Sequence, residues 1–128
     1  LGDYQAFEKE NIIMIHEDEF QKGYFDASVR DYLTNAAINY YLNKSKEDLK
    51  VELIRDASLA SMSLVLLANE AGLETITMSG YDSEQLKSAL KISDRYLDVM
   101  LIAMGKGIKE GHKTVRHDVN KVIYKNKI

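Results

Sequence analysis

The chain has 128 residues, a length that suits one domain, so residues 1–128 are treated as a single unit. Hydrophobic residues make up 45% of it and charged residues 29%, values typical of a folded globular protein rather than a disordered one. The net charge of -3 provides no basic field that could neutralise phosphates, which argues against a nucleic-acid partner.

Cysteine is absent, which excludes disulfides, thiolate catalysis and cysteine-ligated zinc and fits a cytoplasmic protein. The longest uncharged apolar stretch, residues 57–68, is far shorter than the roughly 20 residues that span a bilayer, so we expect no membrane segment. The opening sequence LGDYQAFEKE has neither the basic nor the apolar region of a signal peptide. Residues 1–3 resemble the end of a strand, and we expect the domain to begin upstream of them.

A first helix is predicted over residues 26–41. Its apolar residues recur at the i, i+3, i+4 and i+7 spacing of one helical face, and Asp26 is a suitable N-cap. Tyr32, Tyr40 and Tyr41 fall on this pattern, so we expect them in core or interface packing.

A second, longer helix should run from Lys46 to Ala71. It follows Ser45 with an acidic first turn, and Gly72 is suited to end it because glycine adopts the left-handed conformation without steric cost. Residues 57–68 are apolar around the whole helix, so every side of this segment must be covered. In a domain this small, we favour a partner subunit as part of that cover.

The second half is predicted as strand, loop, helix, strand, polar arm and strand, over residues 74–78, 79–82, 83–90, 96–105, 106–120 and 122–124. Residues 96–105 are almost continuously apolar, which predicts a strand buried on both faces in the middle of a sheet. The order of elements predicts an α+β domain whose helices cover a small sheet.

The sequence predicts neither a metal site nor a catalytic nucleophile. His16, His112 and His117 match no metal-ligand spacing, and residues 16–19 are interpreted as a solvated acidic loop. The serines within residues 57–68 are interpreted as small residues for close packing.

Two segments are candidates for ligand binding. Met78, Ser79 and Gly80 lie at a strand-to-helix junction, where backbone amides are free to meet a ligand; the alternative is an ordinary turn. Arg116 could hold a phosphate with both arms of its guanidinium, and Lys113 could add a second charge; the alternative is a solvated surface patch.

Four segments together resemble FMN-dependent nitroreductases of the small-subunit bacterial type. Residues 68–75, ANEAGLET, are similar to the family's A-x-x-x-G-L-x-T helix exit, and residues 78–82, MSGYD, to its M-G-G-F-D loop. Residues 99–105, VMLIAMG, resemble its V-x-L-I-A-L-G strand. Residues 116–123, RHDVNKVI, fit its R-x-x-V-x-x-V-V tail.

This resemblance implies a nitroreductase-like fold, with a central, mostly antiparallel sheet flanked by helices, and a homodimer with two FMN sites at its interface. It places Met78 in the flavin loop, the backbone amides of Ser79 and Gly80 near the flavin ring, and Arg116, with Lys113 as a second contact, on the FMN phosphate. It also implies ping-pong transfer of hydride from NAD(P)H to a nitroaromatic, a quinone or a related acceptor.

The chain departs from the family pattern in three respects. The family's N-terminal helices have no counterpart here, Ser79 stands where glycine or glutamate is common, and residues 117–118 are His-Asp where Leu-Pro is frequent. Two further hypotheses therefore stay open, a non-catalytic flavin-binding relative and a dimerisation module.

Overall fold

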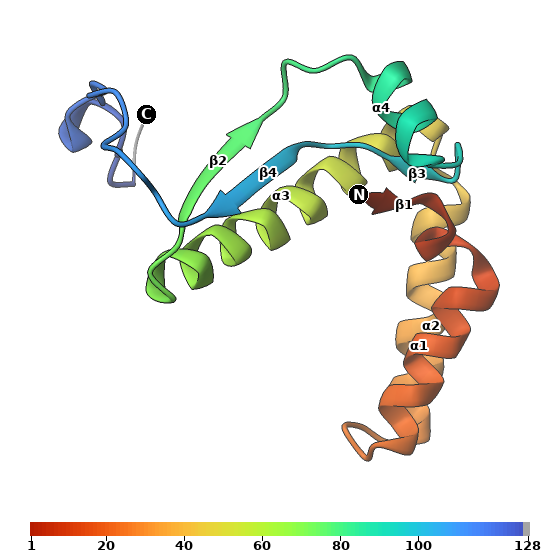
Figure 1. The fold of residues 1–128 in the computed structure, drawn as a ribbon. Coiled ribbons are helices and arrows are strands. Elements are labelled where there is room, and N and C mark those ends of the chain that lie inside the picture. Colours follow the sequence, from red (N-terminus) through yellow and green to blue (C-terminus); the bar gives the residue numbers. More distant parts are fainter. Residues whose placement is uncertain (127–128) are drawn as a thin grey trace.

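The computed structural model describes residues 1–126. After a two-residue strand and a 3-10 turn come three long helices. Two strands that lie along the third helix follow, with a short fourth helix between them and an arm after them (Figure 1). In chain order the elements are β1 (Gly2–Asp3), η1 (Tyr4–Phe7), α1 (Lys9–Gln21), α2 (Ala27–Leu42), α3 (Lys46–Glu70), β2 (Glu74–Met78), α4 (Ser83–Leu90), β3 (Tyr96–Leu97), β4 (Leu101–Gly105) and η2 (Val119–Lys121).

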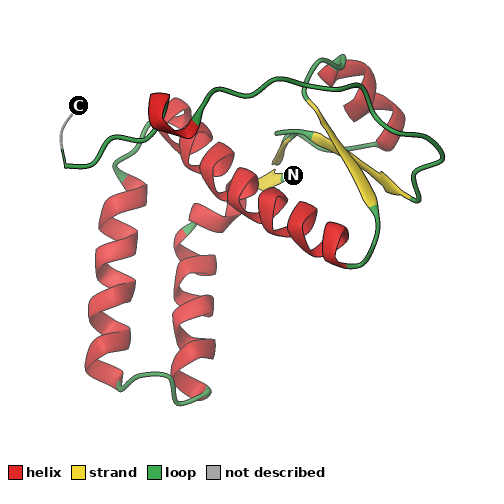
Figure 2. Ribbon diagram, turned by 90° about the vertical axis from the view of Figure 1, so that its left-hand side faces the viewer, coloured by secondary structure: helices red, strands yellow, loops and turns green. Residues whose placement is uncertain are grey.

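Helices α1 and α2 form an antiparallel pair that projects from one end of α3 (Figure 2). The interpretation of residues 16–19 as a loop was wrong, because they lie inside α1. His16 Nδ1 is 3.1 Å from Thr34 Oγ1, and Arg30 forms an ion pair with Glu17 at 3.0 Å, so the polar run faces α2 rather than solvent alone. The run of charged residues suggested a loop. The helix nevertheless has an apolar side, which includes the buried Ile12.

The predicted boundaries of α2 and α3 are confirmed to within one residue. Asp26 accepts a hydrogen bond from the amide of Val29 at 2.9 Å, and Ser45 forms a capping box at the start of α3. Gly72, with φ of +72°, follows the end of α3 in the left-handed region. Within residues 1–126, no helix is both long and apolar enough to cross a bilayer.

The tyrosines of α2 pack less than predicted. Tyr32 and Tyr40 are exposed, whereas Tyr41 is half-buried and stacks on Phe7 with ring centroids 4.6 Å apart. Of the three, only Tyr41 packs toward the interior of the chain, and α2 buries no residue completely. Interface packing of Tyr32 and Tyr40 stays a prediction.

Strand β2 is confirmed at its predicted limits, and α4 begins as predicted with Asp82 as its N-cap. Strand β4 pairs with β2 in antiparallel register, from Glu74 opposite Gly105 to Met78 opposite Leu101. The predicted strand over residues 96–105 is interrupted at 98–100, and its first part, β3, pairs instead with β1.

Two other expectations for the second half were wrong. Strand β4 is half-buried or exposed, so it is not buried on both faces, and among the described residues it pairs with β2 alone. Residues 122–124 are exposed and follow η2 instead of forming a strand. The arm that carries them extends beyond the end of the β2–β4 ladder (Figure 1).

Strand β1 is held against the start of the long helix. A Cβ atom on Gly2 would lie 2.9 Å from Leu53 Cβ, so only glycine lets the backbone approach this closely. Asp3 accepts a hydrogen bond from Arg95 Nε at 2.8 Å, which ties β1 to the chain before β3. These contacts place Leu53, only 4% exposed, at the centre of the small core.

We therefore expect Leu53→Ala to lower the free energy of unfolding by about 2–5 kcal/mol, since it removes buried methyl groups and leaves a cavity. Denaturant unfolding measures this change. The matched control is Leu42→Ala at the end of α2, where the side chain is 60% exposed and the loss should stay below about 0.5 kcal/mol. Equal losses in the two variants would contradict this placement of the core.

The Asp3–Arg95 pair should make stability depend on acid pH. The hydrogen bond from Arg95 lowers the pKa of Asp3, so the pair stabilises the fold above the pKa that Asp3 has in the unfolded chain. That contribution is lost as the pH falls through the lowered pKa. Asp3→Asn should lower the thermal midpoint at neutral pH and flatten its decline in acid. Arg95→Gln should do the same, and the double variant should be no worse than either single one.

Candidate functional site

The turn after α3 sets the position of the candidate site. The Leu73 amide donates to the Ala68 carbonyl at 2.9 Å, and the left-handed Gly72 reverses the chain. Strand β2 therefore returns along α3, and its last residues face the middle of the helix (Figure 1).

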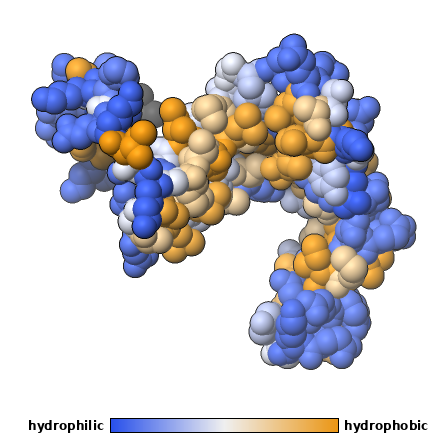
Figure 3. Space-filling view, viewed as in Figure 1, coloured by the Kyte–Doolittle hydropathy of each residue, from blue (hydrophilic) through white to orange (hydrophobic). Residues whose placement is uncertain are grey.

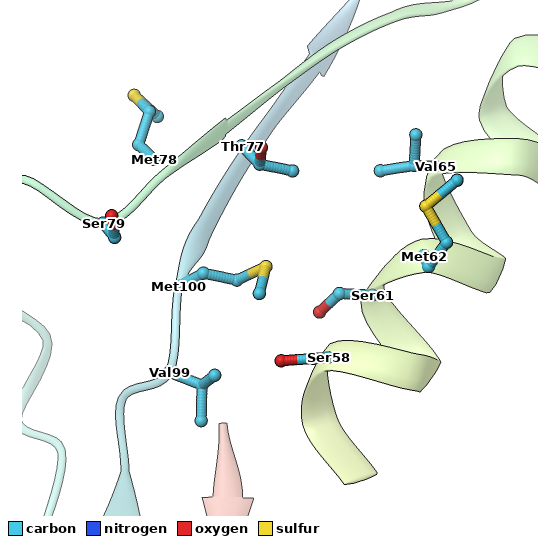
Figure 4. Close-up of a pocket in the computed structure, with 9 residues that line it drawn as sticks. All are labelled: Ser58, Ser61, Met62, Val65, Thr77, Met78, Ser79, Val99 and Met100. Carbon is cyan, nitrogen blue, oxygen red and sulfur yellow. The ribbon is translucent and has the colours of Figure 1, made fainter. Parts of the chain in front are cut away.

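A cavity of about 350 Å³ lies between α3 and the ends of the two strands (Figure 4). Thr77 and Met100 point toward the helix, and Ser58 and Ser61 point back toward them. The helical residues on its wall have the spacing i, i+3, i+4 and i+7, so they share one face of α3. The lining residues are Ser58, Ser61, Met62, Val65, Thr77, Met78, Ser79, Val99 and Met100.

The wall of this cavity is apolar with a few hydroxyl groups and carries no charged side chain. Such a composition favours a largely uncharged ligand that needs a few hydrogen bonds for orientation. The interpretation of the serines as packing residues missed Ser58 and Ser61, whereas Ser63 donates to the Leu59 carbonyl at 3.1 Å and is exposed. The spacing of Ser58, Ser61 and Val65 was the signal that could have identified the wall.

A second hollow of about 180 Å³ continues from the first toward Leu1. The two hollows share Ser61, Val99 and Met100, so the apolar space runs along α3 beyond the end of β1.

The predicted loop lies at the rim of the first cavity. Met78 and Ser79 line it, and Gly80 follows, past the last pair of the β2–β4 ladder. A Cβ atom on Gly80 would meet nothing within 4 Å, so the space beside its backbone is open. The structure thus leaves room for a ligand beside this turn.

Arg116 and Lys113 lie elsewhere. Arg116 lines a wider, separate hollow of about 650 Å³ over the β2–β4 ladder, together with Lys106 and His112. Its guanidinium donates to the carbonyl of Val115 at 3.2 Å, and Lys113 is exposed in the same arm. Within one copy of residues 1–126, the structure does not bring Arg116 and Ser79 into one hollow.

Asp98 is a half-buried acid near the loop that the sequence interpretation did not single out. Its side chain is 8% exposed and lies 3.9 Å from Lys87 Nζ on α4. Burial acts to raise the pKa of Asp98, but hydrogen bonds, among them those from the hydroxyls of Ser83 and Tyr81, together with the charge of Lys87 outweigh it and lower that pKa. Among the residues described, no group of three or more His, Asp or Glu side chains could hold a metal ion.

The sequence profile of the nitroreductase family matches residues 4–106. The chain belongs to the nitroreductase family. The predicted family is thereby confirmed, and the match includes α1 and α2 as well as the first three of the four motif segments.

Relatives and solved structures of this nitroreductase-family chain agree with the assignment. MhqN of Bacillus subtilis, assigned as an NAD(P)H nitroreductase, is 33% identical over 113 residues, which are 88% of this chain and 54% of MhqN. The CLA biosynthesis enone reductase of Lactiplantibacillus plantarum is 30% identical over 81% of this chain and 50% of its own length. A crystal structure assigned as a nitroreductase of Exiguobacterium sibiricum in complex with FMN superposes with a TM-score of 0.87 at 31% identity, covering 98% of this chain and 59% of that one.

These comparisons confirm a nitroreductase-like α+β fold. They also show that the chain spans about half the length of the curated relatives it matches.

The cavity wall predicts a difference between two serines of the same helix. Ser61→Leu should place a side chain inside the hollows and weaken the binding of an apolar fluorescent dye, since Ser61 lines both of them. Ser63→Leu makes the same change on an exposed site and should leave dye affinity nearly unchanged. A fluorescence titration measures both, and equal affinities would show that the dye does not enter these hollows.

Proposed function

We propose that this chain is the cofactor-binding part of an FMN-dependent oxidoreductase that passes hydride from NAD(P)H to a nitroaromatic, a quinone or a related acceptor. The observation that carries the proposal is the apolar cavity between α3 and the strand ends, with the Ser79–Gly80 turn at its rim. The FMN bound in the Exiguobacterium sibiricum structure supports the choice of cofactor, and the enone reductase supports conjugated acceptors.

The residues present fit a flavin ring. The cavity volume of about 350 Å³ lies in the range of small-molecule sites, its walls are apolar, and the space beside Gly80 is open. FMN, when bound, supplies the two-electron redox chemistry. The chain's contribution is to bind and orient the ring, with Met62 and Met100 in contact with it and the amides of Ser79 and Gly80 as hydrogen-bond donors.

Arg116 would hold the phosphate, because a guanidinium can donate two parallel hydrogen bonds to it, with Lys113 as a second cation. The arm carries both residues away from the cavity within one copy, so this assignment requires the arm to move or to serve another copy. The proposed kinetics are ping-pong, with the nicotinamide and the acceptor occupying the same cavity in turn. A cytoplasmic location is part of the proposal, because a sequence without cysteine fits a reducing compartment.

A homodimer completes the proposal. Apolar side chains of α3 that face away from the strands are exposed, and apolar residues gather on the surface around α3 and the strands (Figure 3). The exposed ones include Leu59, Leu66 and Leu67. Contiguous apolar surface of this kind marks interaction sites in soluble proteins. Sedimentation analysis should give a dimer, and a monomer at all concentrations would contradict this part.

The test of the proposed function is an FMN titration followed by anaerobic addition of NADH or NADPH. The purified protein should bind FMN, and the visible flavin band should bleach with the nicotinamide. Bound flavin that no nicotinamide reduces would favour the non-catalytic flavin-binding alternative. Absence of FMN binding would overturn both.

Gly80→Ala should weaken FMN binding by about tenfold or more, because a methyl group would occupy the open space beside the turn. The variant should fold normally, since that methyl group meets nothing within 4 Å. Ser79→Ala is the control. It keeps the backbone amide and removes only the hydroxyl, so FMN affinity should be nearly unchanged. A larger loss for Ser79→Ala would transfer the role from the amides to the side chain.

Arg116→Ala should weaken FMN binding by about 10–100-fold, the range expected when hydrogen bonds to a charged group are lost. Riboflavin provides the control ligand, because it has the same ring without the phosphate and should bind the wild type and the variant equally. If riboflavin affinity falls as far as FMN affinity, Arg116 does not act on the phosphate.

A further inference from the structure

Asp98 lies where the predicted continuous strand is interrupted, between β3 and β4. A carboxylate that is only 8% exposed is costly unless other groups partner it, because burial removes its hydration. Its partners in the structure come from the loop after β2 and from α4. Asp98 therefore joins two segments that the backbone ladder does not join.

The register of the ladder explains which loop residue it meets. The last antiparallel pair is Met78 with Leu101, so Tyr81 and Asp98 each lie three residues beyond the end of the ladder. Burial raises the pKa of Tyr81, and the charge of Asp98 and the hydrogen bond to it raise it further, which fits a phenol held against the carboxylate. Side-chain bonding thus replaces main-chain pairing at this point.

Helix α4 supplies the remaining partners from one face. Ser83 and Lys87 are four residues apart, so both side chains lie on the same side of the helix, toward Asp98. Asp82 caps α4 by accepting from the Gln85 amide at 3.0 Å. The turn at Ser79 and Gly80 is consequently fixed at both ends, by the β2–β4 ladder before it and by the Asp98 cluster after it.

We propose that Asp98 is a positioning residue, which holds the Ser79–Gly80 turn at the rim of the cavity by binding Tyr81, Ser83 and Lys87. This inference rests on the proposed function only for the ligand, FMN, that the turn would contact. Hydrogen-bond donors whose direction is already set cost no reorganisation when a ring binds, and Asp98 would set that direction from outside the cavity.

The test compares Asp98→Asn with Asp94→Asn. Asp94 lies 3.7 Å from the same Lys87 Nζ, but its side chain is fully exposed. The two variants therefore make the same chemical change beside the same cation, at a shielded position and at an exposed one. Amide hydrogen exchange at Gln85 and Leu86, whose amides both donate to Asp82 at the end of the turn, is the first readout, and it needs no cofactor. Exchange there should rise about tenfold or more in Asp98→Asn, since bonds to a buried charge are weakened, and stay unchanged in Asp94→Asn.

The second readout is the reduction potential and visible spectrum of FMN bound to each protein. Both should shift in Asp98→Asn and not in Asp94→Asn, whereas a role confined to general stability would leave the bound flavin unchanged. If Asp98→Asn does not fold, Tyr81→Phe removes one hydroxyl and keeps the ring, and the same local rise in exchange is expected from it.

Exchange at Gln85 and Leu86 that is unchanged in a folded Asp98→Asn variant, or raised equally across β2 and α3, would overturn the inference. If the protein does not bind FMN but amide exchange rises locally in Asp98→Asn, the proposed function is contradicted and the positioning role is supported. The two failures are therefore distinguishable.

Discussion

Helix α3 is followed by a left-handed glycine, Gly72, and the hydrogen bond from the Leu73 amide to the Ala68 carbonyl closes the helix end. This reversal sends β2 back along the helix and fixes which residues face one another. Had the chain continued in another direction, Thr77 and Ser79 would not oppose Ser58 and Ser61. The cavity, the pairing of β4 with β2 and the placement of the turn all depend on this one connection.

The end of the ladder is the second decisive feature. Backbone pairing between β2 and β4 stops at Met78 and Leu101, and the chain before Leu101 carries a buried charge. A strand partner would satisfy backbone groups, whereas Asp98 needs side-chain donors, and Tyr81, Ser83 and Lys87 supply them. The interruption at residues 98–100 is thus linked to a polar cluster that orders the neighbouring turn.

Few side chains are buried in this chain, and many large apolar ones are exposed on α3 and on the arm. The apolar space beside α3 also continues past the cavity to Leu1. Both features accompany a chain that spans about half the length of its relatives. Removing this exposed apolar surface from water by contact with a second copy would lower the free energy of the system, which is the physical basis of the proposed dimer.

The sequence by itself determined α2, α3, β2 and α4, because capping residues and apolar periodicity act within a few residues of one another. Four short motifs in order also indicated the nitroreductase family. Local patterns failed where the outcome depends on a distant partner. Helix α1 is stabilised by its contacts with α2, and residues 122–124 have strand-forming side chains but pair with no strand among the described residues.

Only the tertiary structure decided which residues of each element face the cavity, that Arg116 and Ser79 occupy separate hollows, and that Asp98 meets Tyr81. Each of these depends on contacts between segments far apart in the sequence, whose geometry is set by the turn at Gly72 and the β2–β4 register.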